Sequence, residues 1–280
     1  MIDRLRLATT IVAAIAAAAI ALVPLASSSG ARAQTPVAKP ADAAASKCDR
    51  GQFRVFLDVG HTPEEGGAVS ARGVNEYEFN LVLAKDIEKK LLEAGFGRTL
   101  LQVTTGEKNA GLVHRVVAAN RSKANLLLSV HHDSVPDRFL EQWEYEGKQL
   151  GYCDRFKGHS LFVSYVNPRR AASLRFARLL GKALKARGLQ YTPHYTQAFM
   201  GERRRELVDT DGGVYRFDQL YVLRATGMPA VLMEAGSIIN RDEELALASE
   251  ARRALIAASV VDAVTDFCAG AASANMAGMK

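Results

Sequence analysis

The sequence predicts one α/β domain, built on a twisted, mostly parallel sheet with helices on both of its faces. Short apolar runs of strand length alternate along the chain with longer segments of helical period, which is typical of parallel strands joined by helices. No internal repeat, heptad pattern or second domain interrupts this alternation. About 220 residues separate the first and last cysteines, enough to bury the core of one domain.

The first half of the chain supplies three predicted strands and two predicted helices. Runs rich in Val, Leu and Phe predict buried strands at residues 54–59, 98–105 and 125–130. A helix is predicted over residues 76–94, because one stripe at helical spacing holds Phe79, Leu83, Ile87 and Leu91. Gly95 is a suitable C-terminal cap for it. The second helix is predicted over residues 112–122.

The second half continues the alternation but contains two long stretches without a clean period. Strands are predicted at residues 159–166, 220–224 and 229–233, and helices at residues 171–187 and 241–267. We interpret residues 136–158 and 191–218 as irregular surface segments. Long structureless loops in compact domains are often lids, so one hypothesis is that either segment gates a site.

The N-terminus predicts export. Arg4 and Arg6 precede a long run of Ala, Ile, Leu and Val, and an A-x-A pattern follows at residues 31–33. This order is typical of a secretory signal peptide cleaved after residue 33. The alternative is an uncleaved membrane anchor, since the apolar run is nearly long enough to span a bilayer. In either case we expect the folded part to work in the periplasm or cell envelope.

The remaining boundaries follow from composition. Residues 34–47 are rich in Pro, Ala, Ser and Lys and have no apolar period, which predicts a flexible tether. The predicted domain spans residues 48–268, and residues 269–280 are expected to be a disordered tail.

The charge balance favours an anionic partner. The formal net charge is +6, and removing residues 1–33, with their three arginines and one aspartate, leaves +4. Such a mildly basic chain suits an anionic envelope polymer or a membrane surface. No dense basic patch with interleaved aromatic residues indicates nucleic acid, and no phosphate-binding glycine loop indicates a nucleotide cofactor. We expect a monomer.

Three cysteines follow the predicted signal peptide, and they lack the spacing of a zinc knuckle. Cys48 and Cys268 bracket the domain, whose termini are expected to lie close together. In an oxidising compartment this predicts a Cys48–Cys268 disulfide.

Polar side chains stand where three predicted strands end. His61 follows the first strand, His131 the third and Glu234 the last. In open α/β sheets, ligands bind just outside the carboxyl ends of parallel strands, so these side chains are well placed for chemistry.

Helix phase adds a fourth residue. Glu76 stands at the helix start, three residues before Phe79 and four before Asn80, which places it on the inward stripe. Glu78 aligns with Lys85 and points toward water. Glu76 is therefore the candidate ligand, and Glu78 a solvated residue.

His61, Glu76 and His131 together offer two nitrogen ligands and one carboxylate. A catalytic zinc ion takes three such protein ligands and leaves a fourth position for water. We expect one Zn²⁺ per chain, with Glu234 as the general acid and base beside that water. The alternative is that either histidine only caps its strand through hydrogen bonds.

The motifs around these residues resemble the zinc-dependent N-acetylmuramoyl-L-alanine amidases of the amidase 3 family. The similarity runs in order through residues 58–63, 67–68, 73–81, 129–134 and 231–240. It implies a twisted, mostly parallel sheet and cleavage of peptidoglycan at the amide between N-acetylmuramic acid and the L-alanine of the stem peptide. It also implies that His61, Glu76 and His131 bind zinc and that Glu234 is the catalytic glutamate.

Two further residues have several interpretations. Arg224 is expected to position substrate, to orient Glu234 or to form a structural salt bridge. His132 stands where many family members have a small residue, and it could contact substrate, support a ligand or pack on the surface.

Two other functions fit the same residues. One is a different zinc amidohydrolase of the N-formylglutamate deformylase type, against which predicted export argues. The other is a non-catalytic domain that binds peptidoglycan or activates another protein, against which the retained ligands and Glu234 argue. The sequence leaves open a regulatory protein partner and the preference for intact sacculus or free muropeptide.

Overall fold

The structure is a computed structural model and describes residues 48–277. The predicted signal peptide and tether lie outside the described residues.

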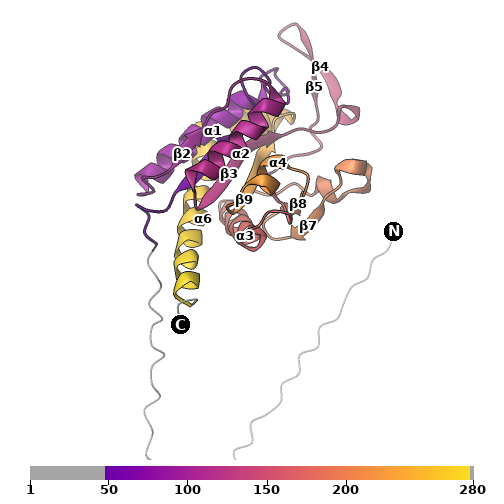
Figure 1. Cartoon of the computed structure of the whole chain (residues 1–280). Coiled ribbons are helices and arrows are strands. Elements are labelled where there is room, and N and C mark those ends of the chain that lie inside the picture. The colour runs from indigo at the N-terminus through magenta and orange to yellow at the C-terminus, as the bar shows by residue number, and fades with distance from the viewer. Residues whose placement is uncertain (1–47, 278–280) are drawn as a thin grey trace, which may run out of the picture. The chain divides into compact units, whose positions relative to one another are not determined.

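A seven-stranded sheet forms the centre of the domain (Figure 1). In spatial order its strands are β2 (Leu100–Gln102), β1 (Val55–Val59), β3 (Leu126–Asp133), β9 (Ala230–Ser237), β6 (Ser160–Val163), β8 (Val214–Arg216) and β7 (Glu206–Asp209). The first four are parallel, whereas β6 runs antiparallel to β9 and β7 antiparallel to β8. The predicted α/β sheet is confirmed, and it is mixed because its direction reverses between β9 and β6.

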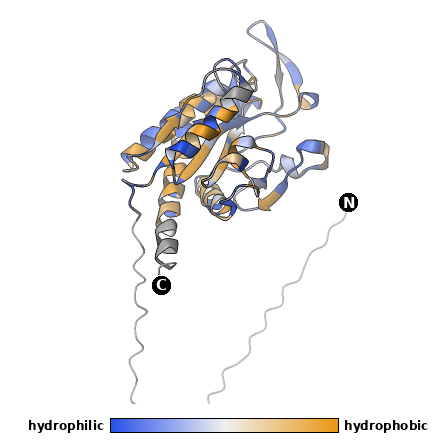
Figure 2. Ribbon diagram, in the orientation of Figure 1, coloured by the Kyte–Doolittle hydropathy of each residue, from blue (hydrophilic) through white to orange (hydrophobic). Residues whose placement is uncertain are grey.

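Helices cover both faces of this sheet. They are α1 (Glu76–Glu93), α2 (Lys108–Ser122), α3 (Arg170–Ala186), α4 (Tyr221–Ala225), α5 (Arg241–Ala248) and α6 (Glu250–Ala277). Side chains of α1, α3 and α6 share one core with the sheet, and those of α2 and α4 share another on the opposite face. Figure 2 shows the alternating hydrophobic and hydrophilic bands along α1 and α2 that this packing requires. We call these faces the α1/α6 face and the α2/α4 face.

One predicted strand is wrong. Residues 220–224 lie mostly in the short helix α4, with Val222 and Leu223 buried in the core of the α2/α4 face. Strand β9, which follows, pairs with β3 on one side and β6 on the other, so no sheet edge beside it is free. When an apolar run is too short to show a period, its secondary structure depends on the space that the rest of the fold leaves for it.

The segment predicted as an irregular loop over residues 136–158 contains a hairpin. After a 3₁₀ turn, η1 (Asp137–Phe139), strands β4 (Glu141–Tyr145) and β5 (Lys148–Tyr152) pair and project from the sheet (Figure 1). Glu146 and Gly147 form the tight turn with φ values of 50° and 74°. Glu-Gly is a weaker turn signal than Asn-Gly or Asp-Gly, which is why the sequence pattern missed it.

The other predicted irregular segment, residues 191–218, is partly ordered into regular elements. Two 3₁₀ helices, η2 (His194–Thr196) and η3 (Ala198–Arg203), precede β7 and β8, which complete one edge of the sheet.

The predicted final helix is divided in two. Ser249 has extended backbone (φ −77°, ψ 143°) between α5 and α6, and its hydroxyl accepts a hydrogen bond from the amide of Arg252 at 3.2 Å. This is an N-cap interaction, which starts α6 in a new direction. Helix α6 continues to Ala277, through most of the segment for which the sequence predicts a disordered tail.

The predicted disulfide is present. Cys48 and Cys268 are bonded with their Cα atoms 5.2 Å apart, which ties the start of the domain to α6. Cys153 is buried and free. Within residues 48–277, no helix is both long and apolar enough to cross a bilayer.

Candidate metal centre

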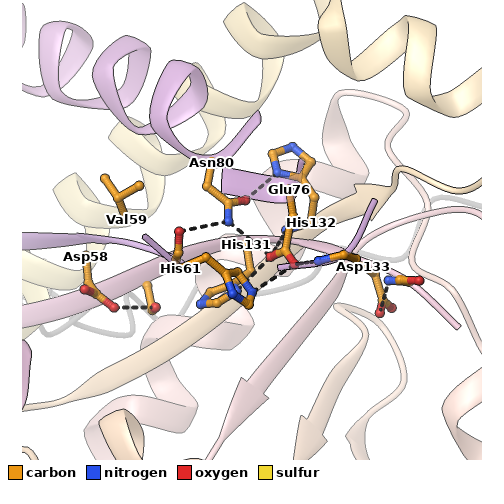
Figure 3. A network of polar contacts seen from close by, with 12 residues as sticks. Asp58, Val59, His61, Glu76, Asn80, His131, His132 and Asp133 are labelled. Atoms are coloured by element: carbon orange, nitrogen blue, oxygen red, sulfur yellow. Dashed lines mark hydrogen bonds and ion pairs between the residues drawn. The ribbon is translucent and has the colours of Figure 1, made fainter. Parts of the chain in front are cut away.

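Three side chains from three elements converge at the carboxyl end of the parallel strands (Figure 3). Nε2 of His61 lies 2.9 Å from Oε2 of Glu76, and Nδ1 of His131 lies 2.9 Å from Oε1 of the same carboxylate. The three ligand atoms all lie within 4.8 Å of one another. The structure therefore brings together the three residues that the sequence predicts as metal ligands.

Two glycines allow this close approach. A Cβ atom on Gly60 would lie 2.5 Å from the ring of His131, and one on Gly67 would lie 2.6 Å from Oε2 of Glu76. Gly67 also has a φ of +80°, in the left-handed region that favours glycine. His61 itself has a φ of 64°, so the turn that presents the first ligand is strained.

A buried ion pair stabilises that strained turn. Nη1 of Arg115 on α2 lies 3.0 Å from Oδ1 of Asp58, and Ser129 donates its hydroxyl hydrogen to Oδ2 of Asp58 at 2.7 Å. Arg115 also donates to the backbone carbonyls of Val59 and His61. The sequence gives no sign of this role, since nothing in the helical pattern of α2 shows where Arg115 finds its partners.

Glu76 is held in its ionised form. Burial opposes ionisation, but hydrogen bonds and charges from His131 and His61 outweigh burial and hold the pKa of Glu76 well below its ordinary value. Ionised carboxylate is the form that binds a cation. Glu78, by contrast, is exposed, as its helix phase predicts.

His132 supports this carboxylate from the α1/α6 face. Asn80 donates to Oε1 of Glu76 at 3.1 Å and to the carbonyl of Gly60 at 3.3 Å, and its Oδ1 lies 2.8 Å from Nδ1 of His132. Burial lowers the pKa of His132 to about 3, so the neutral ring donates to Asn80. His132 is only 3% exposed and packs against Phe79, which contradicts the surface-packing interpretation.

Glu234 lies beside the ligands through strand pairing. His131 on β3 is directly opposite Glu234 on β9, so both side chains point to the α2/α4 face. Glu234 is partly exposed, but its Oε2 is buried and has no hydrogen-bond partner in the described part of the chain. Burial, followed by the negative charges of Asp133 and Glu76, raises the pKa of Glu234 well above its ordinary value. Such a carboxyl group suits proton transfer near neutral pH.

Asp133 is a second buried acid on this face, and the sequence analysis assigns it no role. It accepts hydrogen bonds from the hydroxyl of Tyr195 and the amide of Ser134, both at 2.8 Å. Burial raises the pKa of Asp133 to about 7. Its position two residues after His131 is a signal that could have identified it, because alternate residues of a strand share a face.

Arg224 has no hydrogen bond or ion pair with Glu234 in the described part of the chain. Its side chain is exposed on α4, with the guanidinium 5.7 Å from the ring centroid of Tyr221. Within residues 48–277, no ion pair joins it to an acid, so two of its three interpretations, the salt bridge and the orientation of Glu234, find no support, and substrate positioning stays a prediction.

A cavity of about 280 Å³ opens beside the ligands on the α2/α4 face. His61 and His131 line it, and most of the remaining wall is apolar, with contributions from Leu112, Tyr221 and Leu232; the charged Asp58, Glu65 and Arg115 also border it. We call this hollow the apolar cavity. It provides room for an uncharged part of a substrate next to the metal ligands.

Known proteins share this fold. The chain is 24% identical over 231 residues to the N-acetylmuramoyl-L-alanine amidase AmiC of Neisseria meningitidis, covering 75% of this chain but about half (51%) of that protein. The crystal structure of the amidase Ami1 from Mycobacterium smegmatis superposes with a TM-score of 0.59 at 20% identity, covering 80% of this chain and 99% of that one. The CwlD amidase of Clostridioides difficile, solved in complex with the GerS lipoprotein, has a TM-score of 0.56 at 19% identity, covering 77% and 98%.

The family is shown by the match to a family model. The family model described as N-acetylmuramoyl-L-alanine amidase aligns with residues 55–266. This range begins with β1, ends within α6, and includes all three converging ligand residues and Glu234. The chain therefore belongs to the N-acetylmuramoyl-L-alanine amidase family.

Proposed function

We propose that the chain is an exported, zinc-dependent amidase of peptidoglycan. It cleaves the amide between the lactyl group of N-acetylmuramic acid and the L-alanine of the stem peptide. One observation carries this proposal: Glu234, a carboxyl group with a raised pKa and a buried, unpartnered Oε2, lies directly across a strand pair from His131 in the convergent ligand set. Family membership supports the choice of substrate.

The donor set fits zinc. Two imidazole nitrogens and one carboxylate are the ligands of many catalytic zinc sites, and those of His61, His131 and Glu76 are close enough to share one ion. When bound, zinc polarises a carbonyl group and lowers the pKa of a water molecule. The contacts of Asn80 with Glu76 fix the orientation of the carboxylate before any ion arrives.

Glu234 moves the proton. It takes a proton from the attacking water and gives it to the nitrogen of L-alanine as the carbon–nitrogen bond breaks. Its raised pKa favours holding the proton between these two steps. The apolar cavity beside His61 and His131 accommodates an uncharged group next to the scissile amide.

Digestion of purified peptidoglycan tests the proposal. We expect a cleared zymogram band that a chelator removes and added zinc restores, and mass spectrometry should show stem peptides with a free L-alanine amino terminus. Peptidoglycan binding without clearing would instead support the non-catalytic alternative. Turnover of N-formylglutamate without release of stem peptides would support the deformylase-type alternative.

Export is a separate part of the proposal, supported by the sequence of residues 1–33. Fractionation of cells that express the tagged full-length chain should place it in the periplasm or envelope, and a cytoplasmic location would contradict export. The complex of CwlD with a lipoprotein supports the idea that a protein partner regulates this chain as well.

A further inference from the structure

Cationic side chains gather at the end of the sheet opposite the metal ligands, where the parallel strands β1, β2, β3 and β9 begin. A hollow of about 460 Å³ opens there, lined by Phe53 before β1, Asn125 before β3 and Pro229 before β9. Arg169 and Arg175 line the same hollow. We call this end of the domain the amino-end surface. Its cations are Arg50, Arg54, Arg98, Arg121, Lys123, Arg169, Arg170 and Arg175.

The charges of the amino-end surface are not neutralised within the domain. None of its cations forms an ion pair with an acid of residues 48–277. Arg50 donates to the backbone carbonyl of Ala94 at 2.9 Å, and Arg175 donates to that of Phe267 at 3.2 Å. Such contacts with uncharged carbonyl groups orient a guanidinium and leave its positive charge in place.

Acids at this end compensate only part of that charge. Glu93, at the end of α1, is already paired with Lys90 at 2.8 Å. Asp49 and Asp266 are exposed and offset two of the cations. The amino-end surface therefore carries a net positive charge, which favours an anionic partner.

Helix stability explains some of these cations but not all of them. Arg121 and Lys123 stand at the C-terminus of α2, where a positive charge is favourable to the helix dipole. Arg169 and Arg170 stand at the N-terminus of α3, where a positive charge is unfavourable, and the first turn of α3 has neither an acidic residue nor a side-chain cap. An anion outside the domain would relieve this repulsion.

The N-terminal apolar run is attached at the same end. The described chain begins at Cys48, which is bonded to Cys268, the residue after Phe267 in the wall of the hollow. In Figure 1 the end of α6 and the hairpin that follows the carboxyl end of β3 lie at opposite ends of the domain. Residues 34–47 can span at most roughly 50 Å between the predicted signal or anchor segment and Cys48. A membrane that holds that segment is therefore within reach of the amino-end surface.

We propose that the amino-end surface docks on a bilayer containing anionic phospholipids, so that the metal ligands face away from the membrane. This inference goes beyond the proposed function and rests only on the export that accompanies it. His131 lies five residues along β3 from Leu126, a rise of roughly 16 Å, so a docked membrane leaves the ligands accessible. Cell-wall polymer suits this surface less well, because a substrate has to reach the opposite end of the strands.

Vesicle co-sedimentation of the exported chain, purified from the cell envelope, tests the proposal. We expect binding to vesicles with about one-third phosphatidylglycerol to be about 100-fold or more tighter than binding to pure phosphatidylcholine vesicles, because each Lys or Arg near an anionic surface adds roughly fivefold. The ratio of the two affinities cancels any binding by residues 1–33 that does not depend on lipid charge. It should fall as salt is added, a result that needs no variant.

The amino-end variant Arg98→Gln/Arg121→Gln/Arg169→Gln/Arg170→Gln changes only exposed side chains. Its ratio should fall at least tenfold, since four of the proposed contacts are removed. Circular dichroism should show an unchanged fold.

A charge-matched control separates local docking from overall charge. Lys148→Gln/Arg155→Gln/Lys157→Gln/Arg204→Gln removes four exposed cations from other parts of the domain and should keep the wild-type ratio. Equal binding of the wild type to both kinds of vesicle, or equal losses in the two variants, would overturn the inference. A wild type that ignores anionic vesicles, together with loss of binding to purified sacculi in the amino-end variant, would assign the surface to cell-wall polymer and also overturn it.

Discussion

The two faces of the sheet differ in what their helices leave uncovered. On the α1/α6 face, helices of 18, 17 and 28 residues bury an apolar core against the sheet. On the α2/α4 face, α4 has only five residues, and the apolar cavity remains open beside His131. Glu234 also points to this second face. The apolar cavity therefore opens on the face of the sheet that has the shorter helical cover.

Adjacent histidines on β3 show what this difference means for individual residues. His131 points to the α2/α4 face, which we call the open face because of the apolar cavity. His132 points to the α1/α6 face, which the long helices cover and which we call the covered face. The two differ because successive side chains of a strand alternate. The same residue type is a candidate ligand on one face and a neutral, buried hydrogen-bond donor to Asn80 on the other.

The largest expected effect is on the open face. Glu234→Gln should lower kcat on peptidoglycan by about 10³-fold or more, because the variant cannot transfer the proton. The bound zinc, measured by atomic absorption, should remain near one per chain, since Glu234 is not among the three converging ligands. Substantial residual turnover would show that another group moves the proton.

Removing the disulfide should affect the covered face only. Cys48→Ser/Cys268→Ser should lower the free energy of unfolding by about 2–5 kcal/mol, since the bond closes a loop of 220 residues. Denaturant unfolding measures this loss. The kcat of the folded variant at low temperature should equal that of the wild type, and a matching loss of kcat would mean that the two faces are coupled.

A smaller effect, on zinc affinity, is expected for His132, the residue of the covered face that supports the ligand Glu76 through Asn80. His132→Ala should weaken zinc affinity by about 10–100-fold, because Asn80 loses the hydrogen bond that orients it toward Glu76. Competition with a fluorescent chelator measures this change. His131→Ala is the comparison, and it should abolish specific zinc binding. Equal losses in the two variants would contradict different roles for the two faces.

The smallest effect is expected at the exposed glutamate of α1. Glu78→Ala should change neither zinc affinity nor kcat/KM beyond about twofold, because the side chain points to solvent. Glu76→Gln, two residues away, should lose zinc. A large effect of Glu78→Ala would mean that the helix phase assigns the wrong glutamate.

Much of the candidate site could be predicted from the sequence. The apolar runs before His61, His131 and Glu234 predict the strands that carry them, although β3 continues to Asp133 and β9 to Ser237, and the stripe of α1 separates Glu76 from Glu78. Continuous apolar runs and a period of 3.6 residues are local features, which the sequence displays directly. The role of Arg115 could not be predicted in this way, because its partner Asp58 is 57 residues distant and on a different element.

The sequence by itself determined the α/β class, the candidate ligand set and the pairing of Cys48 with Cys268, because alternation, helix phase and bracketing positions are properties of the linear chain. Tertiary structure decided that residues 220–224 form a helix, that the sheet reverses at β6 and that His132 is buried beside Asn80. The physical reason is that these outcomes depend on which sheet edges and cavities remain after the other strands have paired. The apolar cavity beside His131 belongs to this second group, since it is enclosed by segments far apart in the sequence.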